Sequence, residues 1–246
     1  MDTLALIWLL APYLAFASKA VVGAVQRFYH RRVDRGLILL GALLVPYVLV
    51  ASPMLRTNLN AFANGLLAMA AYIFIPGALA IYRQKTRKPR PFDLADALVI
   101  LVLWLPVEFD WLPPAAVPVA GLGVPVGKIT GVVLALLIFL VIRPLSQIGY
   151  NFGFTLRDLR RAGGAALALA AVGIPLGLII GFLVWNPLPV LNVDRIVLQF
   201  VGVYLLIALP EELLFRGIFQ NLVESASPNT SGPRSSSSRW SLAPPT

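Results

Sequence analysis

The chain contains no cysteine and a single histidine, His30, among its 246 residues. A disulfide, a thiol nucleophile and a cysteine metal site are therefore excluded. Charged residues make up only 13% of the sequence, whereas soluble domains carry roughly a quarter. Hydrophobic residues make up 59% and fall in long blocks, which is typical of a multi-spanning membrane protein rather than of a large soluble core.

Seven apolar blocks predict membrane-spanning helices, each close to the roughly 20 residues that cross a bilayer. They cover residues 3–25, 36–54, 61–82, 94–112, 125–142, 163–185 and 196–223. The predicted fold class is therefore all-α, a transmembrane helical bundle of about seven helices. Within the first block, the stretch Ala15-Phe16-Ala17 weakly resembles a signal-peptide cleavage site. Because Asp2 and no basic residue precedes the apolar stretch, an uncleaved first span is favoured.

Two segments break this pattern. Segment 113–127 is rich in proline and glycine and is predicted to be an ordinary outer connection, with an extended or re-entrant path as the alternative. Residues 225–246, rich in serine and proline, are predicted to be disordered because they offer too little apolar surface to bury. The predicted regions are an N-terminal membrane region over 1–145, a second region over 146–224 that contains the charged helix described below, and the tail.

The net charge of +9 would suggest a nucleic-acid partner in a soluble protein. Here the basic residues lie in short connections between apolar blocks, so nucleic acid is not expected. Connections 26–35, 83–93 and 143–161 hold 13 lysines and arginines, whereas only Arg56, Lys128 and Arg195 lie in or next to the other three connections. The positive-inside rule therefore predicts an integral membrane protein with its N-terminus outside.

The last apolar block contains "ALPEELLFRGIFQ", residues 208–220, with three charges among apolar residues. Glu212 and Arg216 lie one helical turn apart, about 40° from each other around the helix, and can form an ion pair. Glu211 points elsewhere and would face the bundle interior without a paired cation. An unneutralised carboxylate in an apolar site suits a general base. The alternative is that these charges only mark the cytoplasmic end of the span.

The stretch "EELLFRG" at 211–217 resembles the first motif, EExxxR, of the CPBP family of intramembrane proteases, which includes the CAAX prenyl endopeptidases and bacteriocin-processing proteins. The preceding stretch 153–182 also resembles that family, so the similarity covers roughly 145–224. The resemblance implies a helical membrane core with a polar cavity toward the cytoplasm, in which peptide bonds are cleaved. It implies that Glu211 activates the attacking water and that Glu212 and Arg216 complete the site.

The resemblance also implies partners and a location. Substrates would be peptides or proteins, prenylated CAAX tails being the best known in the family, and membrane lipids would surround the chain. Together with the charge pattern, the family favours the plasma membrane of a prokaryote. A divalent metal is disputed for the family, so the cofactor is left unknown here.

The chain departs from the family in one important respect. The family has a later FxxxH motif and then a histidine with Asn or Asp four residues on, and this chain has neither. The activated water would lack its second holder and the oxyanion its donor, so activity is expected to be very low or zero. We interpret the serine- and proline-rich run after Glu224 as a frameshift or truncation of the domain.

Two other functions compete with proteolysis. The chain could be an ion-coupled transporter that uses the buried charges, or a non-catalytic membrane scaffold. Against a transporter, the sequence shows no repeat relating two halves and no second set of buried charges. Among the remaining polar residues, His30 is expected to face headgroups, Lys19 to snorkel or face the bundle, and Glu108 and Asp110 to lie at a solvated helix end.

Overall fold

The computed structural model describes residues 2–32, 34–86, 94–119, 122–145 and 155–185, with 197, 200, 202–204 and 212. The chain divides into two units, 1–150 with 198–246, and 151–197, and each is described by itself. The described residues are mostly helical, as predicted. They include three helices long and apolar enough to cross a membrane, namely Asp34–Ala51, Leu59–Gln84 and Leu156–Ile179. The predicted tail, 225–246, and most of the predicted seventh span, 196–223, lie outside the described residues.

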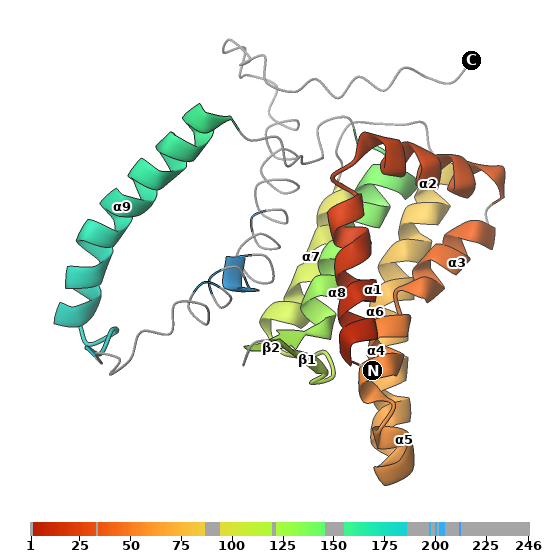
Figure 1. The fold of residues 1–246 in the computed structure, drawn as a ribbon. Helices are drawn as coiled ribbons and strands as arrows, with labels where there is room; N and C mark the ends of the chain where they lie inside the picture. The colour runs from red at the N-terminus through yellow and green to blue at the C-terminus, as the bar shows by residue number, and fades with distance from the viewer. Residues whose placement is uncertain are drawn as a thin grey trace. The chain divides into compact units, whose positions relative to one another are not determined.

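The prediction of one straight span over 3–25 is wrong. Helix α1 (Asp2–Ala15) and helix α2 (Lys19–Arg31) are bent by 101° at a short break, and the pair counts at most as one broken span. The backbone of Ser18 is extended at this break. Figure 1 shows α2 running across one end of the neighbouring helices. Helix α2 is amphipathic, with Val22 and Tyr29 buried on one face and basic residues elsewhere, so its sequence favours a surface position.

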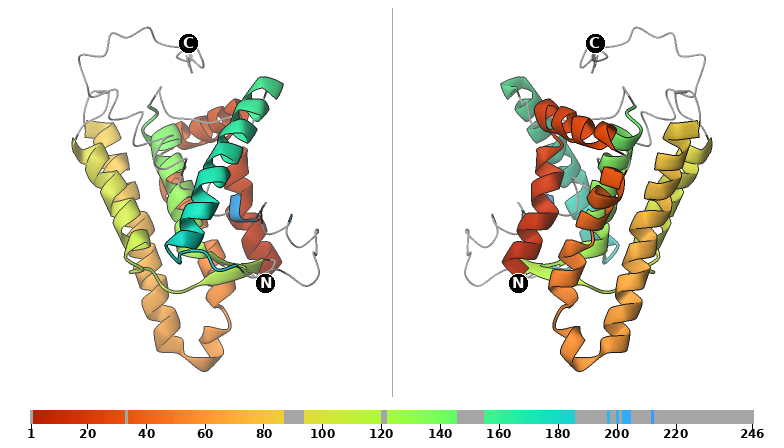
Figure 2. Two further views of the ribbon diagram at one scale, coloured as in Figure 1. Left: turned by 90° about the vertical axis from the view of Figure 1, so that its left-hand side faces the viewer. Right: turned by 90° about the vertical axis from the view of Figure 1, so that its right-hand side faces the viewer.

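The second predicted span, 36–54, exists as the candidate span Asp34–Ala51, but it is broken. Helix α3 (Asp34–Ala42) and helix α4 (Val45–Ala51) are separated by a tight turn. Pro46 has no amide hydrogen to donate to the carbonyl of Ala42, which explains a break at this place. A short helix, α5 (Met54–Thr57), then reverses the chain, and Figure 2 shows it at the end of this unit opposite α2.

The third predicted span is confirmed by α6 (Leu59–Thr86), the longest helix of the described residues. The fourth, 94–112, is shorter than predicted, because α7 (Leu94–Glu108) ends before Asp110. Asp110 has a left-handed backbone with φ of 51°, and the amide of Trp111 closes the helix end on the carbonyl of Pro106.

The prediction of an ordinary connection over 113–127 is wrong, and the extended alternative is right. Strands β1 (Ala116–Val119) and β2 (Leu122–Pro125) pair antiparallel, with Val117 opposite Val124. Both of these valines are buried, whereas their neighbours along each strand are exposed. This alternation and the β-branched side chains stabilise a hairpin where proline and glycine alone predicted a loop. The described fold is therefore not purely α.

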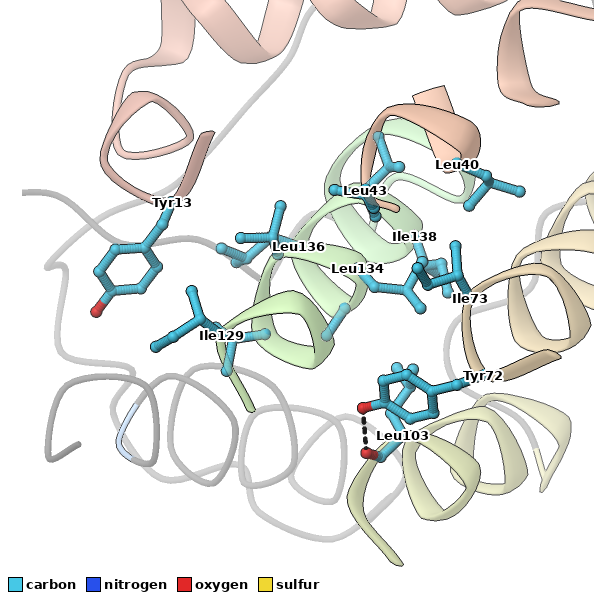
Figure 3. Close-up of a cluster of buried hydrophobic side chains, with 14 of the residues drawn as sticks. Tyr13, Leu40, Leu43, Tyr72, Ile73, Leu103, Ile129, Leu134, Leu136 and Ile138 are labelled. Atoms are coloured by element: carbon cyan, nitrogen blue, oxygen red, sulfur yellow. Dashed lines mark hydrogen bonds between the residues drawn. The ribbon is translucent and has the colours of Figure 1, made fainter. Parts of the chain in front are cut away.

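The fifth predicted helix is confirmed and forms the centre of its unit. Helix α8 (Val126–Leu136) continues as a π-helical turn, η1 (Leu137–Ile142), and every side chain in it is buried except Lys128. Helices α1, α6 and α7 contact α8. Figure 3 shows Leu134 and Ile138 packed toward Ile73 of α6. A helix that is apolar on all sides is buried on all sides.

Helix α2 covers the end of this central helix through one hydrogen bond. The Nε2 of Gln26 donates to the carbonyl oxygen of Leu140 over 2.6 Å. That carbonyl has no helical donor because residue 144 is a proline and the amide of Leu145 bonds to Phe139 instead. The side chain of Gln26 therefore supplies the hydrogen-bond donor that the proline at position 144 cannot supply.

We expect Gln26→Ala to lower the free energy of unfolding by about 1–3 kcal/mol, because it leaves a partly buried carbonyl unsatisfied. Thermal unfolding in detergent, followed by circular dichroism, measures the effect. Gln26→Glu, which keeps the length but presents no amide donor to the carbonyl, should be at least as unstable. Wild-type stability in both variants would show that water caps Leu140 equally well.

The second unit contains α9 (Leu156–Ile179), a candidate span that confirms the sixth predicted helix but not its predicted bounds, 163–185. The helix begins early because Thr155 and Asp158 form a capping box. Three of the four arginines assigned to the connection 143–161, namely Arg157, Arg160 and Arg161, lie within its first two turns. The helix ends before Gly181, whose φ of 73° suits glycine.

Candidate functional site

Most of the predicted catalytic group falls outside the described residues. Glu211 and Arg216 belong to that part, so their predicted roles and the Glu212–Arg216 pair stay predictions. Glu212 is described, and it is helical and exposed. The described residues include no group of three or more His, Asp or Glu side chains that could hold a metal ion.

The other polar residues of the sequence analysis are placed. His30 is exposed on α2, with its ring 5.2 Å from that of Tyr29. Lys19 is exposed at the start of α2, and Glu108 and Asp110 are exposed at the end of α7, which agrees with a solvated helix end. Glu108 and Asp110 line the cavity described below, and none of the four residues is itself buried.

The structure shows a buried ion pair that the sequence analysis missed. Asp96 lies in the first turn of α7, and Arg143 follows directly after η1. The Nε of Arg143 donates to Oδ1 of Asp96 and its Nη2 to Oδ2, both over 2.6 Å. The two side chains are only 8% and 3% exposed. The expectation that the chain has no second set of buried charges is therefore wrong.

This ion pair joins the ends of two helices that the charge pattern assigns to the same side. Asp96 follows connection 83–93 and Arg143 opens connection 143–161, and both connections are predicted to be cytoplasmic. The carboxylate also faces the positive end of the α7 dipole. An aspartate inside an apolar block was the available signal. It could not indicate its partner, because 47 residues separate the two.

This pair is suited to a structural role, holding two helix ends together, rather than to a reaction. Both carboxylate oxygens of Asp96 accept from the guanidinium of Arg143, which is the strongest geometry for such a pair. A carboxylate engaged on both oxygens is a poor general base. The pair therefore fixes α7 against η1 and positions the surrounding helices.

A cavity of about 610 Å³ lies at the opposite ends of α7 and α8, beside the hairpin. Its walls are mostly apolar and include Leu103, Trp104 and Val132, and Glu108 and Lys128 also line it. The hydroxyl of Tyr72, another lining residue, is already used, since it donates to the carbonyl of Leu103 over 2.7 Å (Figure 3). Pockets of roughly 300–1,000 Å³ hold small ligands, so this one has the size for an apolar group with a polar end.

Asp96, Arg143 and the cavity are thus the described features with functional potential. Neither the ion pair nor the cavity lies in the segment that carries the EExxxR motif. No protein-family model, curated protein or solved structure matches the chain. The likeness to the CPBP family rests on the stretch 211–217 and its surroundings in the sequence.

Proposed function

We propose that this chain is an intramembrane endopeptidase of the CPBP type, present in an incomplete form. The observation that carries the proposal is the sequence "EELLFRG" at 211–217 in an apolar block. The helical, apolar character of the described residues and their three candidate spans supports it. The orientation proposed with it has the N-terminus outside, in the plasma membrane of a prokaryote.

In this proposal each charged residue of the motif has a separate role. Glu211 accepts a proton from the attacking water, as a general base must. Arg216 neutralises and orients Glu212 one turn away. The substrate is a peptide or protein that reaches the membrane, with a prenylated C-terminal tail as the first candidate. The predicted orientation directs this segment toward the cytoplasmic side.

The residues of this chain do not fit a metal centre of the histidine type. His30 is the only histidine, and it lies exposed on α2 beside Tyr29. Water activated by Glu211 would have no histidine to hold it, and a developing oxyanion would have no histidine donor. We therefore expect the chain as it stands to cleave peptides very slowly or not at all.

A non-catalytic function is the competing proposal, and the buried Asp96–Arg143 pair supports it. This pair is a second set of buried charges, which removes one argument against an ion-coupled transporter. Because it is fully paired, it serves a membrane scaffold equally well. Loss of substrate flux in Glu211→Ala would support transport, and no effect of any kind would support a scaffold.

The test of the peptidase proposal uses two forms of the protein, each reconstituted in liposomes with a fluorogenic farnesylated CAAX peptide. One is the chain as it stands. The other continues after Glu224 in whichever reading frame of the gene encodes FxxxH and a later HxxxN or HxxxD. We expect cleavage by the second form, and Glu211→Ala should lower its rate about 100-fold, as removal of a general base does.

Asp34→Ala is the matched control, because this aspartate is exposed at the start of α3, does not line the cavity and lies outside the motif. Its rate should equal that of the parent. Full activity in Glu211→Ala would overturn the role of that residue. If no reading frame encodes the histidines and the chain does not cleave, the peptidase proposal is wrong and the scaffold or transporter remains.

A further inference from the structure

The last turns of α2 and the start of α3 carry concentrated positive charge. Within residues 27–32 and 34–38, here called the α2–α3 corner, Arg27, Arg31 and Arg32 are exposed and Arg35 is half-buried. The only carboxylate in this segment is Asp34, which is also exposed. Arg27, Arg31 and Arg32 form no ion pair with any other residue that the structure describes. Their charges are therefore available to an external anion.

The same corner exposes large apolar side chains. Phe28 is 39% exposed, and Leu37 and Ile38, in the next helix, are 51% and 62% exposed. The guanidinium of Arg35 lies 4.7 Å from the ring centre of Phe28, and its Nη1 donates to the Phe28 carbonyl over 3.3 Å. The contact of Arg35 with Phe28 thus joins α3 to α2 and places an arginine beside an exposed aromatic ring.

The corner is held in a defined place on its unit. Val22 and Tyr29 bury one face of α2, and Gln26 bonds to the carbonyl of Leu140. Gly36 packs so closely that an added Cβ would lie 3.0 Å from both Tyr29 and Ile81. Since α2 is turned by 101° from α1, a membrane-crossing α1 places α2 near the plane of the membrane surface.

We propose that the α2–α3 corner binds the headgroup of an anionic phospholipid, with the acyl chains against Leu37 and Ile38. Basic side chains beside exposed apolar ones are the pattern of interfacial helices, because headgroups and hydrocarbon meet at that depth. An acidic protein segment would match the charge, but Leu37 and Ile38 belong to the candidate span Asp34–Ala51 and would face acyl chains in a membrane. This inference is independent of the peptidase proposal.

The test compares the binding of dioleoyl-phosphatidylglycerol and dioleoyl-phosphatidylcholine to the full chain in detergent by native mass spectrometry. We expect the wild type to bind the anionic lipid about tenfold more tightly, since each basic residue near an anionic surface contributes severalfold. Arg31→Gln/Arg32→Gln should remove most of this preference and leave phosphatidylcholine binding unchanged. Arg31→Lys/Arg32→Lys, which keeps both charges, should retain it.

The matched control is Arg157→Gln/Arg160→Gln, which removes the same charge from two exposed residues of α9 and should keep the preference. Equal losses in the two glutamine variants would overturn the site, as would a wild type without any preference. If the Arg31/Arg32 glutamine variant fails to fold, the salt dependence of lipid binding by the wild type tests the proposal instead. Preferential binding in the wild type must weaken between 50 and 500 mM salt, because exposed charges are screened, and an unchanged preference contradicts the proposal.

Discussion

Asp96→Ala is expected to lower the free energy of unfolding by about 3–5 kcal/mol, because it removes the carboxylate that two donors of the buried Arg143 guanidinium engage. Arg143 is buried and engages both oxygens of Asp96 at 2.6 Å. In the variant, the charge of Arg143 loses its two hydrogen bonds to this carboxylate, and the contact between α7 and η1 is weakened. Thermal unfolding in detergent, compared with wild type at the same lipid content, measures the loss.

Two further variants separate the lost pair from a general effect of substitution. Glu108→Ala removes an exposed carboxylate from the same helix and should change stability by less than about 0.5 kcal/mol. Asp96→Leu/Arg143→Leu removes both charges, and it should be more stable than Asp96→Ala, since apolar residues often replace a buried ion pair at little cost. A stable Asp96→Ala, or a double variant worse than the single one, would contradict this structural role of the ion pair.

Gly131→Ala is expected to lower the free energy of unfolding by about 2–4 kcal/mol, through overpacking and a lost hydrogen bond. A Cβ built on Gly131 of α8 would collide with the hydroxyl oxygen of Tyr72 on α6. That hydroxyl donates to the carbonyl of Leu103 on α7 over 2.7 Å. The added methyl group therefore disturbs the packing where α6, α7 and α8 meet. Thermal unfolding in detergent again measures the loss of stability.

Gly41→Ala is the matched control, because its Cβ would meet nothing within 4 Å. Alanine is the better helix former by about 1 kcal/mol, so this variant should be as stable as wild type or slightly more so. Combining Gly131→Ala with Tyr72→Phe removes the colliding oxygen and should recover part of the loss. A Gly131→Ala protein as stable as the Gly41→Ala protein would show that Tyr72 moves aside without penalty.

Helices were predictable wherever a long apolar block was enough to define them. Blocks 61–82 and 125–142 contain so few polar residues that an apolar helix is the favoured structure for each. Helix α6 confirms the first of these predictions, and α8 with η1 confirms the second. Breaks were less predictable, because they depend on single residues. Pro46 splits the second span, and Ser18 marks the bend between α1 and α2. An apolar count over 3–25 cannot show that bend.

The sequence alone determined the membrane-like composition, most helical segments, the asymmetry of basic residues and the EExxxR stretch, because these depend on residue type and on neighbours within a few turns. Only the tertiary structure decided that valines 117 and 124 pair in a hairpin, that Asp96 meets Arg143, and that Gln26 caps Leu140. Each of these contacts joins elements that are separate in the sequence. The two polar contacts satisfy buried hydrogen-bonding groups, and no local pattern records which distant partner satisfies them.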